Sequence, residues 1–292
     1  MSSVHPNAGS SSAQEGFLFV QALAVELSTG EVDLPGFPEV LVRIRHALAD
    51  ENVSIERLAR IIGAEPVLAA RLLQMANSAA LNLSGQQVTE LRTAIARMGL
   101  NLVRSTTIAH AVRQLKAAPA LQGLEKPLEM LWHRSVLVAS LCYVLARRHA
   151  PVGADIALLA GLMHGIGRLY ILTRASQHRS LFADVASYQA IERDWHLGIA
   201  IAILENWKMP AEVIQAVRDS EDFARESRGA PTLSDVLVAA SLIAVHHDQP
   251  QMLDARLQSV RPVARLELTR AICDSLVEES KEELRALSEA LA

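Results

Sequence analysis

The spacing of the apolar residues constrains the fold of this chain more than any other feature. One stretch places them at Leu68, Leu72, Leu73, Ala76 and Ala79. Steps of three and four residues are typical of one apolar helix face. Leu, Ala, Val and Ile supply most of the apolar residues, and aromatic residues make up only 4% of the chain, a mixture that favours helices over strands. No strand-like alternation of useful length occurs, so the sequence predicts an all-α protein, a multi-helix bundle.

Glycine, proline and capping residues divide the sequence into helical segments. Pro38 suits a first helical turn, Ser54 precedes a run as an N-cap, and Gly63 ends that run. The helices predicted in this way span residues 17–28, 38–48, 55–62, 66–81, 88–98, 100–117, 128–149, 153–164, 167–174, 178–190, 194–206, 210–219, 233–246 and 265–290.

The clearest internal break, from Pro119 to Pro127, predicts a subdomain boundary near residue 125. Residues 1–15 hold too little apolar content to offset the entropy of ordering them, so we expect a disordered leader. The other units predicted are an N-terminal helical subdomain over 16–125, a second helical subdomain over 126–260, and a C-terminal helix over 261–292. This last helix either packs on the bundle or serves as a partner or dimer helix.

Net charge, cysteine positions and the N-terminal sequence bear on nucleic-acid binding, membrane insertion and the cellular compartment. The net charge is −4 with both signs interspersed, so we do not expect nucleic-acid binding. Cys142 and Cys273 lie far apart in apolar runs and indicate buried free thiols in a reducing compartment. The N-terminus has no secretory signal, and we expect no membrane span of about 18 apolar residues. The sequence predicts a cytoplasmic protein without a cofactor.

Five ordered segments carry a family resemblance. They are LPGFPEVLVRIRHAL (34–48), EPVLAARLLQMANSA (65–79), TAIARMGLNLVRSTTIAHAV (93–112), GLMHGIGRL (161–169) and HLGIAIAILENWKMPAEVIQAV (196–217). In this order they resemble the successive signatures of the HDOD family, an HD-related output domain. The resemblance covers roughly residues 17–245 and implies that the second subdomain is HD-like.

Metal chemistry in HD phosphohydrolases depends on a His, a His-Asp pair and a distant Asp. By resemblance, the His-Asp pair is here His164-Gly165, and glycine offers no ligand. Arg134 stands where the first His is expected, and His133 is one residue away, about 100° around a helix. The run 236–245, where the last Asp is expected, contains no carboxylate. We interpret His133, Arg134, His164 and Gly165 as a vestigial pocket and expect no catalytic residue and no metal ligand.

Other motif positions have both a structural and a functional interpretation. Asn77 and Ser78, inside an apolar run, either bond to neighbouring backbone or bind a ligand. His196, Trp207 and Pro210 follow the H-x-x-x-A-x-x-I-x-x-x-W-x-x-P spacing of the family. We expect all five to be structural, with Trp207 a core anchor.

The resemblance implies a non-catalytic bacterial signal-transduction module, a pseudoenzyme that regulates through an unidentified protein partner. A small-molecule or nucleotide ligand in the vestigial pocket, and a homodimer, both stay open. The alternative is a divergent metal-dependent phosphohydrolase acting on a nucleotide or cyclic dinucleotide, with His133, His164 and Asp235 as ligands. A third hypothesis is a nucleotide sensor that binds without cleaving.

Overall fold

The described part of the chain is helical throughout, as the sequence predicts. The computed structural model describes residues 8–29, 39–50, 52–78, 81–82, 85–116, 121–178, 181–182, 184–278 and 281, which contain no strand. The helices are α1 (Ala8–Thr29), α2 (Glu39–Leu48), α3 (Ile55–Ile62), α4 (Pro66–Ala76), α5 (Leu91–Lys116), α6 (Glu125–His149), α7 (Ala154–Met163), α8 (Ile166–Ala175), α9 (Val185–Asn206), α10 (Ala211–Arg218), α11 (Leu233–His246), α12 (Pro250–Ser259) and α13 (Arg261–Ala264).

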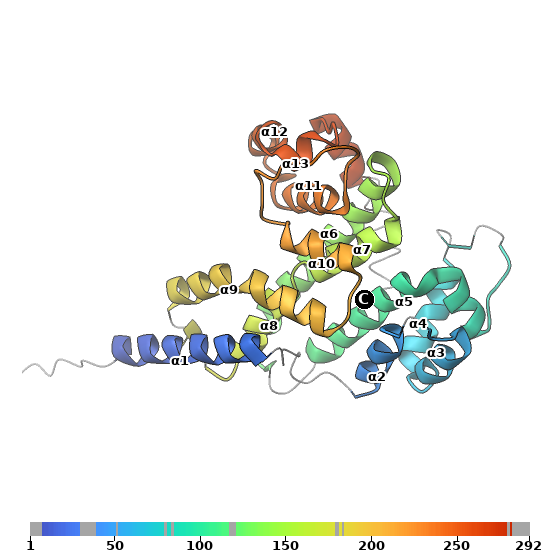
Figure 1. The fold of residues 1–292 in the computed structure, drawn as a ribbon, viewed down its shortest axis with the longest axis horizontal. Coiled ribbons are helices and arrows are strands. Elements are labelled where there is room, and N and C mark those ends of the chain that lie inside the picture. Colours follow the sequence, from blue (N-terminus) through green and yellow to red (C-terminus); the bar gives the residue numbers. More distant parts are fainter. Residues whose placement is uncertain are drawn as a thin grey trace, which may run out of the picture.

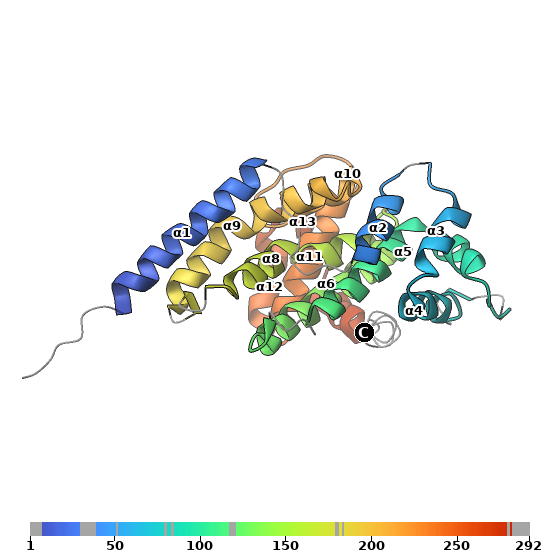
Figure 2. The ribbon, with the colours of Figure 1, turned by 90° about the horizontal axis from the view of Figure 1, so that it is seen from below.

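The helices form two lobes that α5 connects (Figure 1). In the first lobe, α2, α3 and α4 all pack against α5. In the second lobe, α6 packs on α7 and α11, and α8 packs on α9. Helix α1 lies beside α9 at the outer edge of this lobe (Figure 2). The two lobes are joined where α5 contacts α7, and there Asn101 Nδ2 donates to Asp155 Oδ2 over 3.0 Å.

Small residues allow the central helices of the second lobe to approach closely. A Cβ on Gly161 would lie 2.4 Å from Ala139 Cα, so only glycine fits between α7 and α6 at this point. Cys142 and Cys273 are buried free thiols, as predicted. Burial raises the pKa of both thiols.

Several predicted helix boundaries are wrong. Residues 178–190 and 194–206 were expected to form two helices, but α9 is a single helix. The charged pair Arg193 and Asp194 does not interrupt it, because both side chains point into solvent and are 73% and 62% exposed. The break expected at Gly99 is confirmed, because α5 consists of two helical stretches that meet at a kink where Gly99 has the non-helical angles φ 74° and ψ 162°.

The C-terminal region also differs from the prediction. Helices α12 and α13 were not predicted, and each has a proline in its first turn, which a helix start tolerates. The helix expected over 265–290 begins only at Arg270, after a turn in which Glu267 has φ 51°. Residues 279–280 and 282–292 of that prediction lie outside the described residues.

Helix α1 begins at Ala8, inside the segment expected to be a disordered leader. Once residues 17–28 form a helix, each further residue adds one hydrogen bond without a new nucleation cost. Alanine and serine oppose this extension only weakly. Residues 1–7 lie outside the described residues.

Two stretches are long and apolar enough to cross a membrane, contrary to the sequence expectation. They are Glu125–His149 and Ala154–Ala175, with mean hydropathies of 1.3 and 1.5. The apolar window of the first is 56% buried within the fold and that of the second 89%. Their apolar surface is therefore largely used in packing the second lobe.

Candidate functional site

Two of the residues expected to form a vestigial pocket lie where α7 ends and α8 begins. His164 is the C-cap of α7 and Gly165 the N-cap of α8. Two residues later, a Cβ on Gly167 would lie 1.8 Å from the carbonyl oxygen of His196. No side chain fits in that space. Gly167 therefore brings α8 onto α9, and this contact places the Arg168 side chain beside His196.

Four side chains form a hydrogen-bonded group that we call the Arg168 cluster: Arg168, Glu192, His196 and Glu221. Arg168 Nη2 donates to Glu221 Oε1 over 2.9 Å, and Arg168 Nε lies 3.1 Å from Glu192 Oε1. His196 Nε2 lies 3.1 Å from the same Glu221 oxygen. The guanidinium thus holds carboxylates from α9 and from the segment after α10.

The protonation pattern of His196 follows from its neighbours. Its Nε2 lies 3.1 Å from both Glu221 Oε1 and Arg168 Nη2. A guanidinium only donates and a carboxylate only accepts, so Nε2–H and Nη2–H both donate to Glu221. His196 Nδ1 is buried without a hydrogen-bond partner among the described residues. The bond from His196, with that from Arg168, lowers the pKa of Glu221 to about 2.

His164 has a positive environment. Its Nδ1 lies 2.5 Å from the Gly161 carbonyl oxygen, so the neutral ring donates there. Burial lowers the pKa of His164 to about 4, against that backbone bond, and the charges of Arg134, Arg168 and His196 lower it further. His164 is therefore neutral at pH 7, with Nε2 as its remaining acceptor.

The residues present do not fit the divalent metal that the HD resemblance implies. Hard cations need anionic oxygen ligands, but Arg168 already engages Glu192 and Glu221. Gly165 supplies no ligand, and its Cβ position lies 2.9 Å from Ser135 Oγ. In the part of the chain that the structure describes, no group of three or more His, Cys, Asp or Glu side chains could hold a metal ion.

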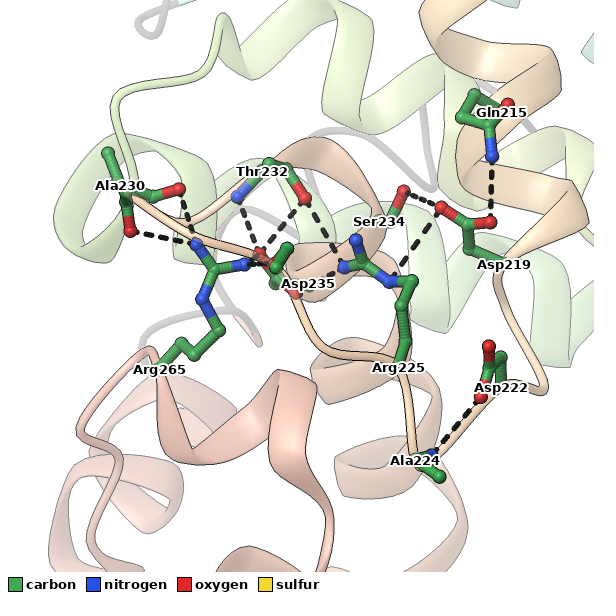
Figure 3. Close-up of polar contacts among 12 residues, drawn as sticks. Gln215, Asp219, Asp222, Ala224, Arg225, Ala230, Thr232, Ser234, Asp235 and Arg265 are labelled. Atoms are coloured by element: carbon green, nitrogen blue, oxygen red, sulfur yellow. Dashed lines mark hydrogen bonds and ion pairs between the residues drawn. The ribbon is translucent and has the colours of Figure 1, made fainter.

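The ligand set of the phosphohydrolase alternative is not assembled. His133 is 75% exposed and lies 3.6 Å from Glu129 on its own helix. Asp235 is fully buried in a separate group near the start of α11 (Figure 3). Of the three residues expected as ligands, only His164 lies in the pocket.

Asp235 is the centre of this second group, which we call the Asp235 hub. Its carboxylate is bonded by the guanidiniums of Arg225 and Arg265, which approach from opposite sides (Figure 3). It also accepts from Thr232 N over 2.7 Å as part of a capping box. Arg265 further donates to the carbonyl oxygens of Gly229 and Ala230. The hub thereby ties the segment after α13 to α11.

The remaining motif residues make contacts within the fold. The Asn77 side chain accepts from Val88 N over 2.7 Å and donates to the Val88 and Leu73 carbonyl oxygens. Ser78 follows it at the end of α4 and is partly buried. Trp207 is 2% exposed and ends α9. Pro210 is the N-cap of α10.

Sequence reasoning missed three members of the Arg168 cluster. Arg168, Glu192 and Glu221 were not considered, and only His196 was singled out. Glu192 and His196 are four residues apart on one helix face, which was an available signal. Arg168 could not be recognised as their partner, because the contact depends on how α8 packs on α9.

The helical architecture and the pocket define an HD-like all-α protein, and solved structures share this fold. A "putative metal-dependent phosphohydrolase" from Shewanella amazonensis SB2B matches with a TM-score of 0.68 and 24% identity, covering 96% of this chain and 100% of the other. An "HDOD domain protein with unknown function" from Geobacter sulfurreducens matches with a TM-score of 0.60 and 21% identity, over 93% and 97% of the two chains.

A "putative signal transduction protein" from Marinobacter aquaeolei VT8 has a TM-score of 0.57 and 21% identity, over 99% of this chain and 67% of the other. An uncharacterized protein from Treponema pallidum (strain Nichols) is 23% identical over 212 residues, which are 67% of this chain but only 39% of that protein. The profile of the HDOD domain matches residues 34–223. The chain belongs to the HDOD family.

Proposed function

We propose that this chain is a cytoplasmic bacterial regulatory module of HDOD type that acts through contacts with another protein and hydrolyses no phosphoester. The observation that carries the proposal is Arg168, whose guanidinium binds the two carboxylates of the vestigial pocket. A fixed positive charge there repels the cation that the parent chemistry requires. The signal transduction protein from Marinobacter, which shares the fold, supports a regulatory role by analogy alone.

Elemental analysis of purified protein tests the catalytic half of the proposal. We expect iron, manganese and zinc far below one equivalent, and no cleavage of bis-p-nitrophenyl phosphate or of a cyclic dinucleotide. Stoichiometric metal, with turnover that disappears in His164→Ala, would overturn the proposal in favour of the phosphohydrolase alternative.

A double variant tests whether Arg134 and Gly165 account for the loss of metal binding that we propose. Arg134→His combined with Gly165→Asp restores the residues expected from the HD resemblance. We expect it to bind metal more tightly than the wild type, and Arg168→Gln added to it should increase the affinity again, because one more positive charge is removed. Unchanged metal content in both variants would contradict the role given to these residues.

The regulatory part of the proposal requires a protein that binds this chain. We expect affinity purification from cells of the source organism to recover the same protein with wild type and with His164→Ala, since the His164 ring is partly buried and bonded within the fold to the Gly161 carbonyl oxygen. A chain that recovers no partner under any growth condition, and that hydrolyses a phosphoester, would refute the regulatory proposal.

A further inference from the structure

A cavity of about 560 Å³ opens between the end of α2 in the first lobe and the end of α9 in the second. We call it the junction pocket. Its lining includes the basic side chains of Arg45, His46 and Lys208 and the amides of Asn52 and Asn206. Asp50 is the one carboxylate that lines it within the described residues. The pocket lies outside the vestigial pocket and shares none of its residues.

Arg45 is a fixed cation at this site. Its side chain is only 9% exposed. The guanidinium carbon lies 5.0 Å from the ring centroid of Trp207, a cation–π contact. Arg45 Nη2 lies 3.3 Å from His46 Nε2, and because a guanidinium only donates, the His46 nitrogen accepts. These contacts hold the positive charge in one orientation toward the pocket.

Lys208 occupies a backbone position that lysine rarely takes. Its φ is 49°, and it follows the C-cap of α9. Met209 N donates to Leu204 O over 2.9 Å and Lys208 N to Glu205 O over 3.0 Å, the two bonds of a Schellman motif, where glycine is the usual residue. The exposed Lys208 side chain forms no ion pair with any described residue. Its presence adds backbone strain without a compensating contact inside the fold.

Most of the charged side chains that line the junction pocket and its neighbouring cavity are positive. Asp50 is paired with Arg57 over 3.2 Å and accepts from Asn52 N. A neighbouring cavity of about 740 Å³ shares His46 and is lined by Arg43, Arg57 and Arg60 without a carboxylate from the described residues. Among the described residues, the two cavities together therefore present five Arg and Lys side chains against one carboxylate, on a chain of net charge −4. Such a concentration of one sign attracts anions.

We propose that the junction pocket binds a phosphorylated small molecule, with its phosphoryl group between Arg45 and Lys208. The volume lies within the range of about 300–1,000 Å³ that is typical of ligand pockets. The deeply set Arg45 guanidinium can be reached by a small anion more readily than by a folded protein surface. The amides of Asn52 and Asn206 can hydrogen-bond neutral polar groups of the same ligand. A bound molecule would contact both lobes and thereby favour one arrangement of them.

Calorimetry on the wild-type protein tests this proposal at constant ionic strength. The probes are inorganic pyrophosphate, ADP and a cyclic dinucleotide. Saturable binding of pyrophosphate alone or of ADP supports the site, and their ratio of affinities shows whether a nucleoside contributes. No saturable heat with any probe up to about 1 mM, the limit of very weak binding, would overturn it. Since the catalytic proposal is judged by metal content and turnover, either can fail without the other.

Two variants locate the binding site. Lys208→Gly should weaken binding by about tenfold or more, because it removes a charged donor. The same change should leave the melting temperature equal or higher, because glycine tolerates the positive φ. Lys126→Ala, which removes an exposed lysine from another cavity of the second lobe, should bind as the wild type does. Binding that is unchanged in Lys208→Gly would contradict the assignment.

Trp207 supplies an independent readout. In a Trp132→Phe, Trp195→Phe background its fluorescence should change saturably with the same affinity that calorimetry gives, since Arg45 lies over its ring. A ligand that binds in calorimetry but leaves Trp207 fluorescence unchanged would place the site elsewhere.

Discussion

The Arg168 cluster and the Asp235 hub both pair carboxylates with guanidiniums but differ in their access to water. Glu192 and Glu221 of the Arg168 cluster are 26% and 44% exposed. Asp235 of the hub is 0% exposed, and its two arginine partners are each 16% exposed. One arginine thus holds two partly exposed carboxylates in the cluster, whereas two arginines enclose one buried carboxylate in the hub.

Solvation decides how strongly each group depends on its partners. A buried charge that loses its partner costs about 3–5 kcal/mol, because water cannot replace the lost contact. A solvent-exposed pair contributes only about 0–1 kcal/mol. We infer that the Asp235 hub is a structural joint, whereas the Arg168 cluster can rearrange at low cost. This is also why Asp235 is poorly suited to the ligand role considered for it.

The largest effect is expected in the hub. Asp235→Asn should lower the free energy of unfolding by about 3–5 kcal/mol, since the mostly buried Arg225 and Arg265 would lose the carboxylate they share and only Arg225 would keep another, Asp219, 3.7 Å away. Urea unfolding followed by circular dichroism measures it. The matched control is Asp254→Asn, whose exposed partner Arg270 is 2.9 Å away and which should cost less than about 1 kcal/mol. Equal losses in the two variants would refute the distinction between buried and exposed pairs.

The second largest change in stability is expected at Gly167, which allows α8 to pack on α9 beside the Arg168 cluster. Gly167→Ala should destabilise the protein by about 1–3 kcal/mol through overpacking, because its Cβ would overlap the His196 carbonyl and force α9 away from α8. Gly198→Ala, on the neighbouring helix α9, is the control. Nothing lies within 4 Å of its Cβ position, so it should gain about 0.5–1 kcal/mol. A neutral Gly167→Ala variant would show that α9 is not held as closely as described.

The smallest change in stability is expected when the negative charge of Glu221 is removed. Glu221→Gln should cost about 1 kcal/mol or less at pH 7, because the carboxylate is partly exposed. The folded pKa of about 2 lies below the usual value of 4.5, so this stabilisation is present above pH 4.5 and is lost as the pH falls toward 2.

The pH dependence of the free energy of unfolding tests the prediction for Glu221→Gln. Urea unfolding between pH 6 and pH 3 should show a shallower loss of stability in Glu221→Gln than in the wild type. His164 contributes in the same direction at higher pH: its pKa of about 4 lies below the usual 6.5, so its contribution is complete above pH 6.5 and falls toward pH 4. Identical acid slopes for wild type and variant would contradict the role of Glu221.

Most of the fold could be predicted from local signals. The helical class, the break at Gly99 and the buried Trp207 agree with the sequence pattern, since helix periodicity and glycine act within a few residues. Helix ends were less certain, because polar residues such as Arg193 and Asp194 can continue a helix on its solvent face. Whether they do depends on packing of the opposite face.

The sequence by itself determined the family and predicts the loss of the metal ligands, because both depend on residue identities at fixed positions. Only the tertiary structure decided that Arg168 holds Glu192 and Glu221, that Asp235 is enclosed by two arginines, and that Lys208 faces Arg45 across the two lobes. These partners are far apart in sequence, and a side chain's charge acquires its role from the burial and neighbours that packing gives it.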